Sequence, residues 1–210
     1  MSTPLGRGHS SGGAKFMTVR YGKLSIKANE NEPDPDLTVR KDQEGKERYY
    51  IEFDYFNGII DGQIERREFE FNGKKLSFLD IPIAAADEKY RLQLKWLSNP
   101  YTYFMSRLEN LDLSKPVTFG AFLDDKGFNM LYMKQDGKTV ENRYPKNNRG
   151  DLPEWEKITY NGEDKWDRTK ETDYYLNVLE NTNKFFERPI ADIPQEQATA
   201  DAEQDDDLPF

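Results

Sequence analysis

The sequence contains no cysteine and only one histidine, His9. The absence of cysteine excludes disulfides, thiolate zinc sites, iron–sulfur clusters and cysteine nucleophiles. A single histidine gives no basis for a Ser-His-Asp triad or an HExxH metal site. No apolar run approaches the ~20 residues of a transmembrane helix, so we expect a soluble, cytoplasmic protein without membrane contact. No cofactor motif is present, and we expect neither a cofactor nor enzymatic activity.

Aromatic and charged residues are abundant instead. The 210 residues include 13 Phe, 12 Tyr and 3 Trp, and 33% of the chain is charged. This length is typical of one large domain, and the aromatic content argues against general disorder. A sizeable core is expected, because a domain near 150 residues buries about 70% of its unfolded surface.

The first sixteen residues, MSTPLGRGHSSGGAKF, do not resemble part of a folded domain. They are rich in Gly and Ser, show no apolar period and lack the apolar core of a signal peptide. We expect residues 1–16 to be a disordered expression leader, with Met17 as the natural start. A short native disordered arm is the alternative. His9 lies in this segment and is given no functional role.

The last twenty residues, 191–210, concentrate the negative charge. They hold seven acids and no base, in a chain whose formal net charge is −9. Without these acids and the two bases of the leader, residues 17–190 hold 32 acids and 28 bases. A segment of acids, Pro, Gln and Ala cannot bury enough apolar surface to fold, so we expect a disordered acidic tail.

Three carboxylates followed by an apolar tripeptide end this tail: Asp205, Asp206, Asp207, Leu208, Pro209 and Phe210. Solubility alone gives no reason for the apolar tripeptide. A docking peptide needs it, because the aromatic ring can fill an apolar pocket while the aspartates steer the peptide to a basic surface. We therefore expect these six residues to bind a partner protein. A purely solvated tail is the alternative.

The ending DDDLPF resembles the acidic tip of single-stranded DNA-binding (SSB) proteins, whose bacterial members typically end in DDDIPF. Leu208 is the one departure. The resemblance implies that the tip recruits DNA replication, recombination and repair proteins, and that the body is an OB-fold that binds single-stranded DNA. Residues 17–190 lack the opening of the bacterial SSB domain, so the closer likeness is to a divergent SSB of a phage or mobile element. Its setting would be the cytoplasm of a bacterium or of a phage-infected host.

Alternating apolar residues and turn dipeptides predict that the body, residues 17–190, is mainly β. Turns are expected at Asn57-Gly58 and Asn72-Gly73, and Pro82 is expected to end its strand. The predicted strands are 18–28 with a bend at Gly22, 48–56, 59–71, 74–83, 90–97, 117–123, 127–135 and 138–142.

One helix is expected to interrupt these strands, from the N-cap Asn99 to Leu113. A helix between the third and fourth strands resembles the OB-fold, a five-stranded barrel, here with an added hairpin over 57–83. A β-sandwich is the alternative. Residues 152–168 are expected to be irregular. Residues 170–187 are expected to form a C-terminal helix, which either packs on the barrel or forms the interface of a homo-oligomer.

A protein that binds single-stranded DNA needs cationic side chains for the phosphates and aromatic side chains on which bases stack. Each stacked base contributes roughly 1–3 kcal/mol to binding. The body interleaves both residue types on its strands, near the expected hairpin tip and in the loop over 143–151. Tyr50 and Phe56 are preferred over their neighbours, since the opposite phase, Tyr49, Ile51, Phe53 and Tyr55, is expected in the barrel interior. The predicted DNA-binding residues are Tyr50, Phe56, Arg66, Arg67, Lys74, Lys75, Lys95, Trp96, Tyr132, Lys134, Arg143, Tyr144, Lys146 and Arg149. For each aromatic residue, a place in the core is the alternative.

These features predict a protein that coats single-stranded DNA without sequence specificity and recruits partners through its tip. One alternative is a carboxylate- and metal-dependent nuclease. Acids are abundant, but none stands in a spacing that predicts a two-metal site; examples are Asp34, Asp36, Asp80 and Asp87. The other alternative is an OB-like adaptor that binds proteins and no nucleic acid.

Overall fold

The computed structural model describes residues 13–30, 34, 37–42, 45–71, 73–86, 88–145, 149–160 and 162–187. The predicted leader up to residue 12 and the tail 191–210, with its tip Asp205 to Phe210, lie outside these residues. The described chain is mainly β, as predicted. Its helices are α1 (Asn99–Met105), the short 3-10 helix η1 (Leu108–Asn110) and α2 (Thr169–Asn183).

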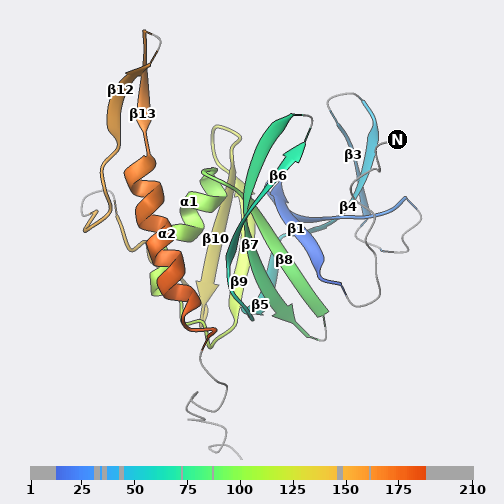
Figure 1. Cartoon of the computed structure of the whole chain (residues 1–210). Coiled ribbons are helices and arrows are strands. Elements are labelled where there is room, and N and C mark those ends of the chain that lie inside the picture. The colour runs from blue at the N-terminus through green and yellow to red at the C-terminus, as the bar shows by residue number, and fades with distance from the viewer. Residues whose placement is uncertain are drawn as a thin grey trace, which may run out of the picture.

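Within the described residues, eleven strands form one curled sheet (Figure 1). In space their order is β11-β10-β9-β5-β7-β8-β1-β2-β4-β3, with β6 also paired to β7. β1 and β8 are parallel, and the other pairs are antiparallel. The strands are β1 (Lys15–Arg20), β2 (Lys23–Lys27), β3 (Leu37–Lys41), β4 (Glu47–Phe53), β5 (Tyr55–Ile60), β6 (Glu65–Phe71), β7 (Lys74–Ala85), β8 (Glu88–Lys95), β9 (Val117–Leu123), β10 (Asn129–Gln135) and β11 (Lys138–Thr139).

The curl of the sheet brings its two halves together around one core. The turn between β1 and β2 reaches the β9–β10 hairpin, where the Gly22 N–H donates to the Asn129 side-chain oxygen over 2.8 Å. Leu24 on β2, Leu92 on β8 and Phe119 on β9 are all fully buried in the same apolar cluster. Alternation therefore gives each of these strands a core face and an outer face.

β5 and β6 follow one another along the same edge of β7, with an interruption at residues 61–64. β7 pairs with β6 along its first half and with β5 near its end. Pro82 lies opposite the interruption, so its missing N–H removes no ladder bond, and its carbonyl accepts from the Asp61 N–H over 3.2 Å. The predicted strand end at Pro82 is therefore wrong, and β7 continues to Ala85.

The predicted turn at Asn57-Gly58 is also wrong, because both residues lie inside β5 and pair with β9. Packing explains the glycine: a Cβ atom on Gly58 would lie 2.3 Å from Ile83 Cγ2 and 2.8 Å from the Ala84 carbonyl oxygen. The expected added hairpin over 57–83 is thus not an appendage. β5 and the second half of β7 belong to the main sheet, and β6 with the first residues of β7 extends beyond it.

The strand predicted over 48–56 is broken at Asp54, between β4 and β5. This break shifts the phase of alternation. Tyr55, expected in the interior, is consequently 61% exposed on the outer face of β5. Ile51, by contrast, is buried as predicted.

α1 begins one residue earlier and ends sooner than predicted. Ser98 is the N-cap in place of Asn99, and its hydroxyl accepts from the Tyr101 N–H over 3.4 Å. At the other end, the Ser106 hydroxyl and the Arg107 guanidinium donate to the Tyr103 carbonyl over 3.0 and 3.2 Å. The chain then leaves the α-helix for η1, so the predicted extension to Leu113 is wrong.

α2 packs along one side of the curled sheet (Figure 1). Tyr175, Val178 and Leu179 are buried in the core cluster. Asn183 fastens the helix to the β5–β6 interruption, since its side chain accepts from the Ile64 N–H over 2.8 Å and donates to the Ile64 carbonyl over 2.9 Å. Packing on the sheet therefore accounts for the buried face of this helix.

The prediction that residues 152–168 are irregular is wrong for most of this segment. These residues contain the hairpin β12 (Glu156–Tyr160) and β13 (Glu163–Asp167), which extends beyond the N-terminal end of α2 (Figure 1). The signal that sequence reasoning missed is the Asn161-Gly162 dipeptide, in which Gly162 has a φ of +80°.

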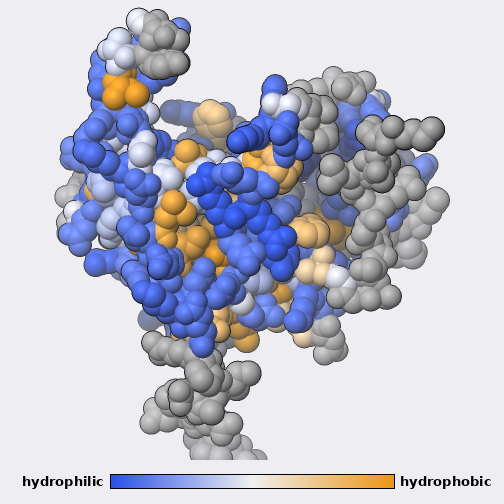
Figure 2. All heavy atoms as spheres, viewed as in Figure 1, coloured by the Kyte–Doolittle hydropathy of each residue, from blue (hydrophilic) through white to orange (hydrophobic). Residues whose placement is uncertain are grey.

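The folded chain begins before Met17. Lys15 and Phe16, assigned from the sequence to the leader, are the first residues of β1 and pair with Tyr90 and Arg91 of β8. Hydrophilic residues cover most of the described surface in Figure 2, while hydrophobic ones gather between α2 and the neighbouring strands. None of the described helices is long and apolar enough to cross a membrane.

Candidate nucleic-acid interface

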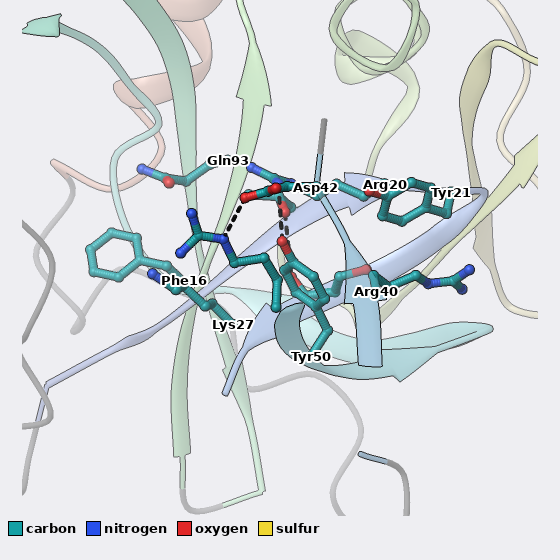
Figure 3. Close-up of a pocket in the computed structure, with 11 residues that line it drawn as sticks. Phe16, Arg20, Tyr21, Lys27, Arg40, Asp42, Tyr50 and Gln93 are labelled. Carbon is teal, nitrogen blue, oxygen red and sulfur yellow. Dashed lines mark hydrogen bonds and ion pairs between the residues drawn. The ribbon is translucent and has the colours of Figure 1, made fainter. Parts of the chain in front are cut away.

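The outer face of β8, β1, β2, β4 and β3 is hollowed into a groove of about 540 Å³ (Figure 3). We call it the cationic groove, because four bases and a single acid line it, together with three aromatic residues. The lining residues are Phe16, Thr18, Arg20, Tyr21, Ser25, Lys27, Arg40, Asp42, Arg48, Tyr50 and Gln93.

Strand alternation explains why these side chains share a face. Met17 of β1 is buried in the core, so Phe16 and Thr18 on either side of it point outward. The register places Thr18 opposite both Ser25 of β2 and Gln93 of β8. β8, which is distant in the sequence, thereby contributes to one floor with the consecutive strands β1 and β2.

Two of the groove's cations are paired with carboxylates. Arg40 donates to Glu52 over 3.0 Å and 2.7 Å, and this hydrogen bonding raises the pKa of the Arg40 guanidinium. Arg48 donates from Nε to Asp42 over 3.0 Å. Both arginines are thus held in fixed positions, although their charge is partly balanced.

The other two cations are not balanced in this way. Arg20 donates to the Tyr50 hydroxyl over 3.3 Å (Figure 3). Neither Arg20 nor Lys27 has a carboxylate partner in the part of the chain that the structure describes. These two side chains therefore give the groove its uncompensated positive charge.

The floor of the groove carries an unsatisfied hydroxyl. Ser25 is 1% exposed, and its Oγ has no hydrogen-bond partner among the described residues. A buried polar group without a partner costs roughly 1–3 kcal/mol. A polar ligand that reaches Ser25 would supply the missing bond.

The turn between β1 and β2 closes one end of the groove. Arg40 lies over the Tyr21 ring, with its Cζ 4.7 Å from the ring centre. A Cβ atom on Gly22 would lie 2.9 Å from the Leu123 backbone nitrogen, so the glycine permits close approach to β9. Leu123 and Phe128 are both exposed. The groove thus ends beside apolar residues of the β9–β10 hairpin.

Of the predicted DNA-binding residues, Tyr50 alone lines the cationic groove. It lies on the face opposite Ile51, but only 7% of it is exposed. The Arg20 Cζ lies 5.9 Å from the centre of its ring. Tyr50 therefore forms part of the wall and orients Arg20, and offers little open face to a base.

The residues predicted for a hairpin-tip cluster are divided between two faces. Arg67 pairs with Phe78 and shares the outer face with the groove, as does Lys74 by alternation. Lys95, predicted as the neighbour of Trp96, pairs with Phe78 on the same outer face. Lys75 and Arg66 have the opposite phase. The cluster therefore does not form a single finger.

Trp96, predicted to stack on a base, continues the core phase of β8 beyond Leu94. Its ring packs on Tyr101 with a centroid distance of 4.5 Å, and the Arg66 Cζ lies 4.5 Å from the centre of the indole. Both neighbours restrict access to the indole faces.

Phe56, Tyr132 and Lys134 lie outside the cationic groove. Phe56 packs on Tyr90 with ring centroids 4.6 Å apart. Tyr132 lies on the outer face of β10, across Gly120 of β9, with the Lys134 Nζ 5.8 Å from its ring centre. These residues are not brought together with Tyr50.

The aromatic residue of the predicted loop site over 143–151, Tyr144, lies in the core and not on the surface. Tyr144 is buried, and its hydroxyl bonds to Glu109 and, over 3.1 Å, to Tyr174. Burial raises the pKa of this phenol. Arg143 is exposed, Arg149 donates to the Pro153 carbonyl over 3.3 Å, and Lys146 lies outside the described residues.

Sequence reasoning missed most of the groove, including Arg20, Tyr21, Lys27 and Arg40, and assigned Phe16 to the leader. The pairings of β1 with β2, β2 with β4 and β4 with β3 bring the four cations onto one face, and residues 37–41 were not recognised as a strand. The parallel pairing of β1 with β8 adds Gln93 and is not visible in local patterns. One usable signal was the segment KLSIK, in which Lys and Ser alternate with buried Leu and Ile.

Among the residues that the structure describes, no three histidine or acidic side chains are grouped so that they could hold a metal ion. Comparisons of the chain with protein-family models, with curated proteins and with solved structures found no match. The functional conclusion therefore depends on the sequence and on the geometry of the groove.

Proposed function

We propose that the protein binds single-stranded DNA without sequence specificity, with the cationic groove as its principal site. The observation that carries the proposal is the combination of four cations, one acid and three aromatic rings in one hollow. Phe16 and Tyr21 are 49% and 45% exposed and offer faces for stacking. Arg20 and Lys27 offer charge to phosphates. Such a surface tolerates any sequence, because every base has a face and every nucleotide a phosphate.

The strand order supports an OB-type barrel as the framework of this site. In chain order, β5, β7, β8, β9 and β10 are five strands with α1 between the third and fourth, and β5 pairs with both β7 and β9. We propose that these five form the OB barrel and that β1 to β4 extend it. OB-folds bind oligonucleotides on the second and third strands and on the loop between the fourth and fifth. Here these are β7, β8 and the β9–β10 turn. Gln93 of β8 lines the groove, and the turn at Gly22 contacts the β9–β10 hairpin.

The acidic tip, Asp205 to Phe210, is proposed to recruit replication, recombination or repair proteins. This part of the proposal depends on the resemblance to SSB tips and on the chemistry of three carboxylates before an apolar tripeptide. The cytoplasm of a bacterial or phage-infected cell is the setting that follows from it.

Titration of a labelled oligo-dT, followed by fluorescence anisotropy, tests the DNA site. We expect the protein to bind the single strand far better than a duplex of the same length, with affinity that falls steeply with salt. The matched pair of variants is Arg20→Ala/Lys27→Ala in the groove and Lys165→Ala/Lys170→Ala on β13 and α2. Each phosphate contact contributes about −0.7 to the salt slope, so the groove variant is expected to lose about 1.4 from its magnitude.

Two results would overturn the proposal: no binding of oligo-dT at low salt, or equal affinities for the two double variants. The first result would favour the protein adaptor. Cleavage of the strand with magnesium or manganese, abolished by a single Asp→Ala change, would instead favour the nuclease.

A further inference from the structure

Asp80 is a buried carboxylate on the outer face of β7. Its neighbours Leu79 and Ile81 are fully buried in the core, so alternation directs Asp80 away from the core. Its side chain is nonetheless 0% exposed. Burial of an ionised carboxylate is strongly unfavourable unless partners compensate it. The side chains around Asp80 must therefore balance its charge.

Three side chains cover this carboxylate. Gln93 Nε2 donates to Oδ1 over 2.9 Å. Arg67 Nε lies 3.2 Å from Oδ2, and Arg91 Nη1 lies 4.0 Å from the same oxygen. Oδ2 makes no hydrogen bond of good geometry among the described residues. The two guanidiniums thus lie against the same oxygen and balance its charge.

The register explains how two arginines converge on one carboxylate. The direct partners of Asp80 are Glu65 on β6 and Gln93 on β8, and each arginine lies two residues from one of them on the same face. Such diagonal neighbours are within reach of long side chains. The arginines therefore approach Asp80 from opposite sides.

Both arginines keep donors for a further acceptor. The Arg67 and Arg91 side chains are 46% and 30% exposed, and each guanidinium has five N–H groups. Arg67 also donates to the exposed Glu65 over 3.0 Å. Each guanidinium therefore has N–H groups that do not face Asp80 and can donate to another acceptor.

This cluster adjoins the cationic groove. Gln93 belongs to both, and the register sets Phe16 of the groove opposite Arg91. On the far side, Phe78 pairs with Arg67 and stacks on Phe69 with ring centroids 5.3 Å apart. A DNA strand that leaves the groove across β8 would next meet the guanidiniums of Arg67 and Arg91, and then the Phe69–Phe78 pair.

We propose that Arg67 and Arg91 form a second phosphate-binding site for the DNA strand, and that Asp80 is the positioning residue that holds both guanidiniums in place. The inference rests on the proposed function and extends the strand's path from the groove to β6. Arginine binds phosphate through parallel N–H bonds, which require a fixed orientation of the guanidinium plane. A buried carboxylate beneath the pair supplies that orientation.

Simple electrostatics and the positioning role predict opposite effects of Asp80→Asn. If Asp80 contributes only its charge, its removal reduces repulsion of phosphates, and affinity rises. If Asp80 positions the arginines, the neutral amide loosens them and affinity falls. We expect affinity to fall about fivefold to tenfold, because two charge-assisted contacts are weakened.

The experiment is an oligo-dT titration of the full chain by fluorescence anisotropy at fixed low salt. The variants are Asp80→Asn, Arg91→Lys and, as the matched control, Glu70→Gln, which removes an exposed acid of β6 on the opposite phase. Thermal unfolding of each variant establishes that it is folded. Arg91→Lys keeps the charge and loses the planar fork, so it tests the site even where Asp80→Asn does not fold.

Weaker binding by Asp80→Asn and Arg91→Lys, with Glu70→Gln unchanged or tighter, supports the second site. Tighter or unchanged binding by Asp80→Asn overturns the positioning role, and wild-type affinity of Arg91→Lys overturns the site. If the unsubstituted protein does not bind oligo-dT, the proposed function fails as a whole. If it binds and depends on Arg20 and Lys27 but not on Asp80, only this inference fails.

Discussion

Two glycines, Gly58 and Gly120, allow atoms of the neighbouring strand to pack directly against their Cα atoms. A Cβ atom on Gly58 would meet Ile83 Cγ2 at 2.3 Å, and one on Gly120 would meet the Tyr132 Cζ at 2.1 Å. Both residues lie in extended strands, β5 and β9. At Gly120 the obstacle is an outer-face ring, whereas at Gly58 the Ala84 carbonyl oxygen is also within 2.8 Å. The main chain cannot move aside as readily as a side chain.

The Gly58→Ala variant is therefore expected to be destabilised, by about 1–3 kcal/mol as is usual for an overpacked site. Urea denaturation followed by circular dichroism measures the difference. Gly62→Ala is the control, because its nearest contact, at 3.3 Å, would be the Pro82 Cγ. Equal midpoints for Gly58→Ala and the unsubstituted protein would show that the strands do not approach as closely as described.

At the scale of elements, the parallel pairing of β1 with β8 adds Gln93 to the groove. Lys15, the first residue of β1, bonds to Glu88, the first residue of β8, with an N···O distance of 2.7 Å. This contact, and then the hydrogen bond from Tyr90, lower the pKa of Glu88. The ion pair thus joins the first residues of β1 and β8, the two paired strands that carry Phe16, Thr18 and Gln93.

Lys15→Met is expected to raise the pKa of Glu88 toward its ordinary value of 4.5 and to lower stability at neutral pH. A carboxyl whose pKa is lowered by folding stabilises the folded state above its unfolded pKa, and this contribution is lost as the pH falls through the folded value. The stability difference between the two proteins should therefore shrink below pH 4.5. Urea denaturation at pH 7 and at acidic pH, with Lys89→Met as control, measures it. A difference that does not change with pH would contradict this role.

The elements themselves were largely predictable, and their exceptions have physical causes. Alternation identified most strands, because one side of each faces the core. It failed at Asp54, where the strand breaks and the phase shifts, and at Gly58, where an Asn-Gly pair serves close packing within a strand. The β12–β13 hairpin was missed because its exposed strands alternate little.

At the scale of the whole molecule, the site was less predictable than the fold. Of the residues predicted from strand phase and local charge, Tyr50 lies in the wall of the groove and Arg67 lies beside Asp80. Arg20, Lys27 and Arg40 were missed, since their common face depends on the pairing of β1, β2, β4 and β3, and residues 37–41 were not recognised as a strand. The parallel pairing that adds Gln93 joins residues 15–18 to residues 90–93 and has no local signal.

Deletion of residues 191–210 is expected to preserve or raise the affinity for single-stranded DNA while abolishing recruitment of partner proteins. The segment carries seven acids and no base, so we expect it, as a polyanion joined to the same chain, to compete with phosphates for the cationic groove. Oligo-dT titration of the shortened protein measures the effect. A large loss of affinity on deletion would contradict it.

The tryptophans all lie outside the groove. Trp96 packs on Tyr101 in the core phase of β8, Trp155 contacts Arg168, whose Cζ is 4.7 Å from the ring centre, and Trp166 lies on β13. Indole emission reports only the immediate surroundings of each ring. Intrinsic fluorescence will therefore follow the melting of the molecule but not the filling of its groove, and a spectroscopist needs a dye on the ligand, or an engineered indole beside Tyr21, to observe occupancy.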